Sequence, residues 1–387
     1  MPVTDLSAGH EGATNVKSAK INVLVVGQIP PPWHGQATAI KQLLDSQFES
    51  VDLHFVRMDF SETIEEVGRW RPVKVLRLLS LIYRIWKIRL VASCRTLYYP
   101  PGGTGYAAII RDSIVLLSCR LLFDRVVFHV HAGGFTRVVD ASPLPLRLIA
   151  RRAYGAPDLL IQLTENSPPD CEAMRAKAVL TIPNGIPDNS CQHSGRGRDP
   201  QADERVQLLF VGAVSRAKGV SVLLEACAIL DSQGLEFHLR VVGDFDSSRY
   251  MADCASFVTA NGLDSRVEFV GALVGDSKWD TFAAADIFCF PSFYQAENQP
   301  LVVLEAMSFG LPIVATDWRG ISTMVADGGS GRLVPVNDPA AMAVGISSLV
   351  TDRELRLKLG AEGRRKYLER YTDAIWRVAM ESALCGP

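Results

Sequence analysis

The strongest constraint on the fold is a short apolar run that opens each half of the chain. Residues 21–27 read INVLVVG and residues 206–212 read VQLLFVG. Continuous β-branched runs of this kind are typical of strands buried on both faces, as in parallel sheets. Further apolar runs alternate with helical stretches after each of them, which predicts a doubly wound α/β unit in each half. The further strand candidates are residues 53–56, 96–99, 126–131 and 159–163, then 239–243, 267–270, 287–291 and 312–316.

The length of 387 residues is too great for one hydrophobic core and predicts two domains. Residues 189–204, NSCQHSGRGRDPQADE, are polar and lack apolar periodicity, so we expect a linker there. The expected domains are 21–188 and 205–370, and residues 371–387 have the apolar spacing of a helix. Residues 1–20 are polar and lack the apolar core of a signal peptide, which predicts a disordered leader.

Composition narrows the classes of function and the cell compartment. The formal net charge of −2 gives no global reason to expect a nucleic acid partner. The eight cysteines are scattered without a C-x-x-C pair, which indicates buried, reduced thiols and a cytoplasmic protein. Neither Gly27 nor Gly212 begins a G-x-G-x-x-G turn, so a dinucleotide oxidoreductase is excluded.

The most informative segment is 290–316, FPSFYQAENQPLVVLEAMSFGLPIVAT. It reads as a strand end, a loop, and a helix that begins near 298–300 and ends at Gly310, with proline in its first turn. The free N–H groups at such a helix start suit a diphosphate. Glu297 and Glu305 would lie up to about 12 Å apart if the residues between them are helical, which suits two carboxylates that accept from separate hydroxyls. Either glutamate alone is also compatible with a purely structural role.

This run, with its E-x7-E spacing, closely resembles the signature of glycosyltransferase family 4, retaining enzymes of the GT-B fold. The resemblance extends over about residues 21–387. It implies two Rossmann-like domains that face each other across a cleft, with the last helix crossing back to the first domain. It also implies transfer of a hexosyl group from a UDP-sugar or GDP-mannose to a glycan or lipid-linked saccharide in polysaccharide assembly. Retention would proceed by front-face attack, and neither a cofactor nor a metal is expected.

The resemblance also assigns residues to the donor site. Residues 210–220, FVGAVSRAKGV, resemble the family's phosphate loop, in which Lys218 and an arginine neutralise the leaving diphosphate. Ala213 stands where many relatives carry that arginine, and Arg216 is its candidate replacement. The other donor-binding candidates are Gly35, Gly212, Gly243, Asn298, Gln299, Pro300, Leu301 and Glu305.

In the first half, residues 130–134, VHAGG, resemble the signature whose histidine lies near the transferred sugar. The catalytic candidates are accordingly His131, Glu297, Lys218 and Arg216. His129 alternates with His131 along the strand and is expected to be a core residue. The sequence Asn184-Gly185 is a turn former that also matches the family pattern. Residues 316–324, TDWRGISTM, depart from the family's Gly-Gly-x-x-Glu, and no role is assigned to them.

Residues 72–90, PVKVLRLLSLIYRIWKIRL, predict a basic amphipathic helix. Lys74, Arg77, Arg84 and Lys87 fall on one arc at 100° per residue and leave a broad apolar face. The stretch has no acidic residue, so it fits an anionic membrane surface, and its cations argue against a membrane span. A core helix with a solvated basic side is the alternative. The expected location is cytoplasmic, at the inner face of the cell membrane.

Two other functions remain open from the residues. A sugar-nucleotide epimerase can share the same fold, because fold does not determine function. A catalytically silent sugar-nucleotide binder at the membrane is compatible with the missing arginine at position 213 and the altered residues 316–324.

Overall fold

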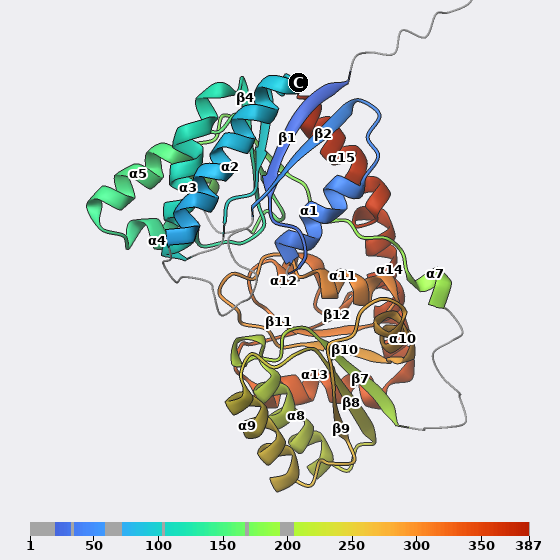
Figure 1. Ribbon diagram of the computed structural model, residues 1–387. Coiled ribbons are helices and arrows are strands. Elements are labelled where there is room, and N and C mark those ends of the chain that lie inside the picture. Colours follow the sequence, from blue (N-terminus) through green and yellow to red (C-terminus); the bar gives the residue numbers. More distant parts are fainter. Residues whose placement is uncertain are drawn as a thin grey trace, which may run out of the picture.

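The computed structural model describes residues 20–31, 35–58, 72–102, 105–166, 170–193 and 205–386. The expected leader lies almost wholly outside these ranges, as do residues 194–204 of the expected linker. The described chain forms two six-stranded parallel sheets with helices packed around them, one sheet above the other in Figure 1. This confirms the predicted α/β class, in the GT-B arrangement.

The first sheet takes its strands from the first half of the chain, in the order β2-β1-β3-β4-β5-β6. They are β1 (Ile21–Gly27), β2 (Val51–Arg57), β3 (Thr96–Tyr99), β4 (Arg125–Val130), β5 (Leu159–Gln162) and β6 (Val179–Thr181). The helices of this half are α1 (Gly35–Asp45), α2 (Pro72–Val91), α3 (Tyr106–Cys119), the 3₁₀ helix η2 (Arg120–Leu122), α4 (Phe135–Asp140), α5 (Leu144–Tyr154), α6 (Asp170–Met174) and α7 (Ser190–His193).

The second sheet has the order β12-β11-β10-β7-β8-β9. Its strands are β7 (Val206–Val211), β8 (Phe237–Val242), β9 (Val267–Gly271), β10 (Ile287–Phe290), β11 (Ile313–Thr316) and β12 (Gly331–Val334). Around it lie the 3₁₀ helix η3 (Arg216–Lys218), α8 (Val220–Ser232), α9 (Ser248–Ala260), α10 (Asp276–Ala284), α11 (Leu301–Ser308), α12 (Ile321–Met324), α13 (Pro339–Thr351) and α14 (Arg353–Arg370). The last helix, α15 (Asp373–Cys385), leaves this half.

The alternating side chains of β1 show how the first sheet is covered. Val23 and Val25 belong to one core cluster, which also contains Trp376 and Met380 of α15. Leu24 and Val26 face the opposite cluster, which contains side chains of α2, α3, α4 and α5. The C-terminal helix therefore completes the core of the N-terminal half, and Figure 1 shows it in red beside β1 and β2.

The structure departs from the sequence expectations at several elements. Strands β6 and β12 were not predicted; β6 is exposed over its whole length and therefore lacks the apolar signature of the buried strands. The expected linker contains the short helix α7. No helix among the described residues is long and apolar enough to cross a membrane.

Candidate active site

The second sheet changes its direction of winding between β7 and β10, which are adjacent although not consecutive. Ligands of open parallel sheets bind at the carboxyl ends of strands at such a point. The segments that follow β7 and β10 carry Lys218 and Glu297. The Lys218 Nζ donates a hydrogen bond of 2.6 Å to Glu297 Oε2, and Ser292 Oγ donates to the same oxygen at 2.6 Å. Two catalytic candidates thus form one ion pair, in which Glu297 is buried and Lys218 is partly exposed.

The loop that holds Glu297 differs from its expected form. Helix α11 begins at Leu301, and Pro300 precedes it in an extended conformation, so proline is not within the first turn. Glu297 therefore lies in a loop, and the residues between the two glutamates are only partly helical. A residue before proline is biased away from helical angles, which explains the late start. Gly320 packs closely against this loop, because a Cβ there would lie 1.8 Å from the Asn298 carbonyl oxygen.

Glu305 is buried in α11 and pairs with Lys278 of α10, whose Nζ lies 2.6 Å from Glu305 Oε1. The Glu305 side chain therefore does not lie on a solvated face of the helix. Its second oxygen, Oε2, is buried and has no hydrogen-bond partner within the described part of the chain. Lys278 was missed because no motif surrounds it, and only the fold brings α10 against α11.

Arg216 lies apart from the Lys218–Glu297 pair. Its guanidinium forms an ion pair of 2.7 Å with Asp253 of α9 and lies over the Tyr250 ring. Lys218, two residues on, pairs with Glu297 instead, so the two cations have different acidic partners in this structure. The loops under them pack tightly, since a Cβ at Gly243 would lie 1.8 Å from the Gly212 carbonyl oxygen.

His129 and His131 lie at the end of β4, with ring centroids 4.0 Å apart. His129 is buried and shares a hydrogen bond of 2.6 Å with the Tyr98 hydroxyl. Burial first, and then the charge of His131, lower the pKa of His129 well below its usual value. His129 is thus the core residue that the sequence predicted, while His131 stands beyond the strand end.

Asp170 positions the loop after His131. Its buried carboxylate accepts hydrogen bonds from the backbone N–H groups of Gly134 and Thr136 and from the Thr136 hydroxyl, each at 2.7 Å. It therefore caps the first turn of α4 although it lies more than thirty residues along the chain. A capping residue this distant leaves no local signal, so sequence reasoning did not find it.

The two halves meet directly at this site. The Asn184 N–H donates to Gln299 Oε1 at 2.6 Å, and the Thr164 hydroxyl donates to Asn298 Oδ1 at 3.3 Å. Farther out, Arg137 of α4 donates to Gln295 Oε1 at 3.5 Å. The side chains of Asn298 and Gln299 are thus engaged with the first half.

Gly35 opens α1 at the carboxyl end of β1. Among the residues that the structure describes, no atom lies within 4 Å of a Cβ built on Gly35, so these residues do not require glycine there. Gln36 ties this loop to the end of β3, because its amide donates to the carbonyl oxygens of Pro100 and Pro101 at 3.2 and 3.4 Å.

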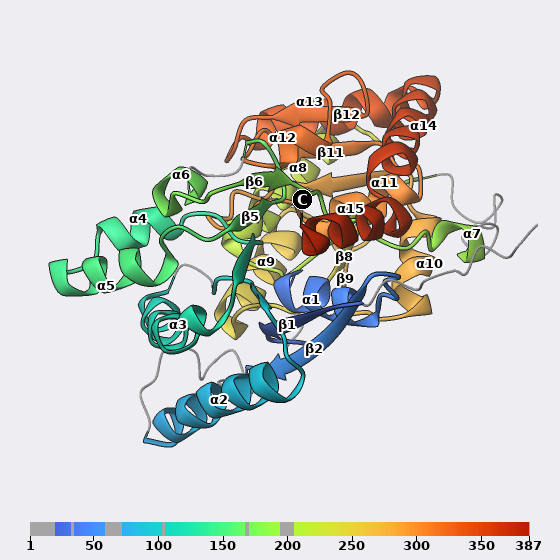
Figure 2. The same cartoon turned by 90° about the horizontal axis from the view of Figure 1, so that it is seen from above.

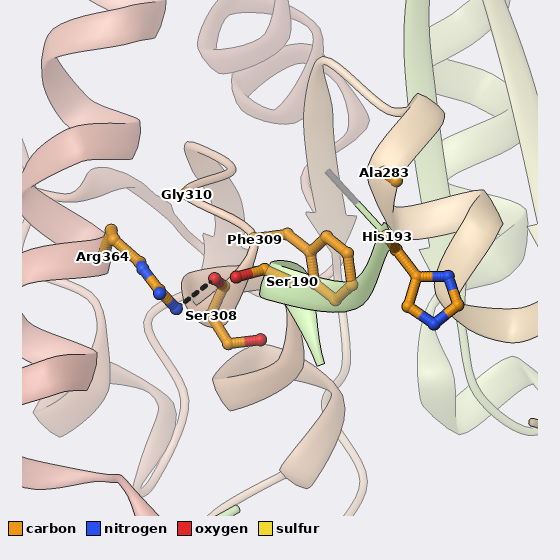
Figure 3. A pocket seen from close by; sticks show the side chains of 7 residues that line it. All are labelled: Ser190, His193, Ala283, Ser308, Phe309, Gly310 and Arg364. Atoms are coloured by element: carbon orange, nitrogen blue, oxygen red, sulfur yellow. Dashed lines mark hydrogen bonds between the residues drawn. The ribbon is translucent and has the colours of Figure 1, made fainter. Parts of the chain in front are cut away.

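A separate hollow of about 270 Å³ lies between α7, α10, α11 and α14, as Figure 3 shows. Arg364 reaches across it to the Ser308 carbonyl oxygen, and its guanidinium also pairs with Asp188. The lining residues are Ser190, His193, Ala283, Ser308, Phe309, Gly310 and Arg364. None of the sequence-predicted site residues lines this hollow.

Comparison with known proteins agrees with this geometry. Residues 205–352 match the family model described as Glycosyl transferases group 1. The C-terminal half of the chain carries a glycosyl transferases group 1 domain. This match spans residues 210–220 and both glutamates of the E-x7-E run.

Curated relatives and solved structures are also similar to this chain. The chain is 31% identical over 201 residues to a phosphatidyl-myo-inositol mannosyltransferase of Mycobacterium leprae, covering 51% of each chain. It therefore spans about half the length of the curated relatives it matches. The fold is similar to that of a sucrose-phosphate synthase from Thermosynechococcus elongatus, with a TM-score of 0.71 and 17% identity. The match covers 93% of this chain and 97% of the synthase. The structure of Anabaena HepE in complex with UDP is similar as well, with a TM-score of 0.69 and 17% identity. The match covers 94% of this chain and 100% of HepE.

Proposed function

We propose that this protein is a glycosyltransferase that moves a hexosyl group from a UDP-sugar or GDP-mannose. The observation that carries the proposal is a pair of Lys–Glu contacts in the second half, in which both glutamates are buried and both lysines are partly exposed. Taking a charged glutamate out of water is costly and such pairs contribute little net stability, so a functional reason for two of them is reasonable. The group 1 domain match and the HepE complexes with UDP and UDP-glucose support this choice of ligand.

The donor's diphosphate would lie at the start of α11, near the backbone of Asn298, Gln299, Pro300 and Leu301. Lys218 would neutralise the charge that builds on the leaving phosphate. Arg216 would contribute to this neutralisation only after its ion pair with Asp253 is broken, so Lys218 would neutralise the larger share of the phosphate charge. We propose that these groups and the helix dipole make a metal unnecessary. Gly35, Gly212 and Gly243 would line the phosphates through their backbone.

The two glutamates would hold the ends of the donor. Glu305 Oε2, buried and lacking a hydrogen bond among the described residues, would accept from a hydroxyl of the nucleoside. Glu297 would accept from a hydroxyl of the transferred sugar, with its second carboxylate oxygen held by Lys218 and Ser292. His131 would contact the same sugar from the first sheet.

We propose that transfer retains the anomeric configuration. The bond between the anomeric carbon and the β-phosphate oxygen breaks, and the electron pair leaves with the phosphate. The acceptor hydroxyl forms its bond to carbon on the same face, and its proton passes to the leaving phosphate oxygen. The products are a nucleoside diphosphate and the glycoside.

We propose a glycan or lipid-linked saccharide in polysaccharide assembly as the acceptor. The contact with a membrane would be made through residues 72–90, at the inner face of the cell membrane. The support is the basic, apolar character of this helix in the sequence.

The first experiment is a thermal-shift panel of UDP, GDP, ADP and dTDP, with and without magnesium. A nucleotide at a hundred times its dissociation constant adds about 2.7 kcal/mol to the free energy of unfolding. We expect one base to raise the melting temperature equally in both conditions. A shift that requires magnesium would overturn the metal-free site, and no shift with any nucleotide would overturn the donor site.

Variants then separate an enzyme from a silent binder. Lys218→Met is expected to lower turnover with the matching nucleotide-sugar by about 10²–10³-fold, the loss typical of one electrostatic group. Glu297→Gln should lower turnover while the nucleotide still shifts the melting temperature. Glu225→Gln, on the exposed side of α8, is the matched control. Nucleotide binding without turnover by any nucleotide-sugar in the unmodified protein would identify a binder instead.

A further inference from the structure

The apolar surface of α2 divides into two parts in the folded protein. Leu81 and Ile85 are buried against the first sheet. A second stripe, at helical positions 0, 3, 7, 10 and 14, remains in contact with solvent. Its members are Leu76, Leu79, Tyr83, Trp86 and Leu90, and their exposed fractions lie between 46% and 75%. A core helix with only a basic solvated side, the alternative expected from the sequence, does not describe this surface.

The neighbouring helices continue this stripe. Helix α3 packs on both α2 and α5, and Figure 2 shows α2 at the outer edge beside α3. Hydrogen bonds join the layer: Arg89 Nε donates to the Leu122 carbonyl oxygen at 2.7 Å, and Arg120 donates to the Ala153 carbonyl oxygen at 2.6 Å. Exposed apolar side chains of α3, η2 and α5 include Ile114, Leu117, Leu121, Leu122, Leu144, Leu148 and Ile149.

We call the exposed apolar residues of α2, α3, η2 and α5 the apolar face. Single exposed leucines are ordinary on a soluble protein, but a group that spans three packed helices marks an interaction surface. Two of its members suit a lipid–water boundary, since Tyr83 and Trp86 are the residue types enriched there. The indole N–H of Trp86 already donates to the Ser118 carbonyl oxygen at 3.1 Å, so its ring can leave water without losing a hydrogen bond.

The charge around the apolar face identifies its partner. Residues 72–155 contain thirteen Lys and Arg against three Asp, a net charge of +10, in a chain whose net charge is −2. Helices α2 and α5 contain no acidic residue. Exposed cations such as Lys87 and Arg152 border the apolar side chains. An anionic lipid surface attracts such a segment, whereas a second copy, which carries the same positive charge, would repel it.

We propose that α2, α3, η2 and α5 together form one face that lies on an anionic lipid bilayer. This inference extends the membrane contact proposed for residues 72–90 and rests on it. The position is consistent with a lipid-linked acceptor, because α4, which starts four residues after His131, leads directly into α5. A chain adsorbed through this face presents the His131 side of the first sheet close to the lipid surface.

The test is co-sedimentation of the full chain with vesicles of phosphatidylcholine, with and without phosphatidylglycerol. We expect binding to the anionic vesicles only. The α2 double variant Leu79→Gln with Leu90→Gln should lower the partition coefficient about tenfold or more, because two apolar contacts are lost. The second double variant, Leu121→Gln with Leu148→Gln, should do the same. The matched control, Leu357→Gln with Leu368→Gln, lies on exposed positions of α14 and should bind as the unmodified chain does.

Two charge-reversal variants complete the experiment. Lys87→Glu should weaken binding to anionic vesicles at least fivefold, and Lys358→Glu on α14 should leave it unchanged. If only the α2 variants lose binding, the extended face is wrong and the contact through 72–90 stands. If the unmodified chain binds neither kind of vesicle, the extended face and the contact through 72–90 are both wrong. Self-association of the unmodified chain that is lost in the same variants would then identify a second copy as the partner. Nucleotide-induced thermal shifts, measured on every variant, show whether the donor site is affected separately.

Discussion

At the scale of single residues, the candidate site is built from charges that the chain satisfies internally. Lys218 and Glu297 pair with each other, and Glu305 pairs with Lys278. A donor that enters must compete with these contacts. The E-x7-E spacing made the glutamates visible in the sequence, but their partners come from other elements of the second half and became known only from the structure.

His129 gives a prediction about pH at this scale. Its pKa is lowered by burial and by His131, so below about pH 6.5 the unfolded chain binds a proton that the folded chain does not. The free energy of unfolding should therefore fall as pH falls, by up to about 1.4 kcal/mol per pH unit for this group. Urea unfolding between about pH 7.5 and pH 5.5 measures the slope. In His129→Gln the slope should be smaller, and equal slopes would contradict the assignment.

At the scale of elements, Asp170 and α4 illustrate a helix start that is capped by a distant residue. Asp170→Ala removes three hydrogen bonds at the first turn of α4 and should lower the free energy of unfolding by about 1–2 kcal/mol. Because the same bonds position the loop after His131, turnover should fall while nucleotide binding, measured by thermal shift, is retained. Thr136→Val removes only the hydroxyl and should show a smaller loss. If Asp170→Ala lost nucleotide binding and turnover to the same extent, that result would argue against a positioning role for Asp170.

Helix α2 shows how periodicity alone underdetermines an element. The pattern of residues 72–90 predicted the helix and its basic side. It could not show that the apolar surface is divided between the sheet and the exterior, because that depends on where the sheet and α3 end. The late start of α11 at Leu301 has a similar origin, since Pro300 and the packing of Gly320 under Asn298 fix the preceding loop.

At the scale of the whole molecule, α15 makes the first sheet dependent on the end of the chain. Trp376 and Met380 are buried in the same cluster as Val23 and Val25. Trp376→Ala should cost about 3–5 kcal/mol of stability, as large core truncations do. Hydrogen exchange should show the loss of protection in β1 rather than in β7. Val378→Ala, exposed on the same helix, is the control, and equal loss in both sheets would contradict a local effect.

Most strands of the two parallel sheets, and the two glutamates of the candidate site, could be predicted from the sequence. Buried parallel strands are continuous apolar runs, and E-x7-E with its apolar helix is a local pattern, so both are readable along the chain. The exact domain boundaries remain predictions.

Only the tertiary structure decided which groups meet. Lys278 and Asp170 act on the site through contacts that no local spacing encodes, and Arg216 pairs with Asp253 of a helix that the motif does not include. The exposed strand β6 and the divided surface of α2 were likewise set by packing. The reason is physical: periodicity records what a residue needs, burial or solvent, while its partner is chosen by the arrangement of elements far apart in the sequence.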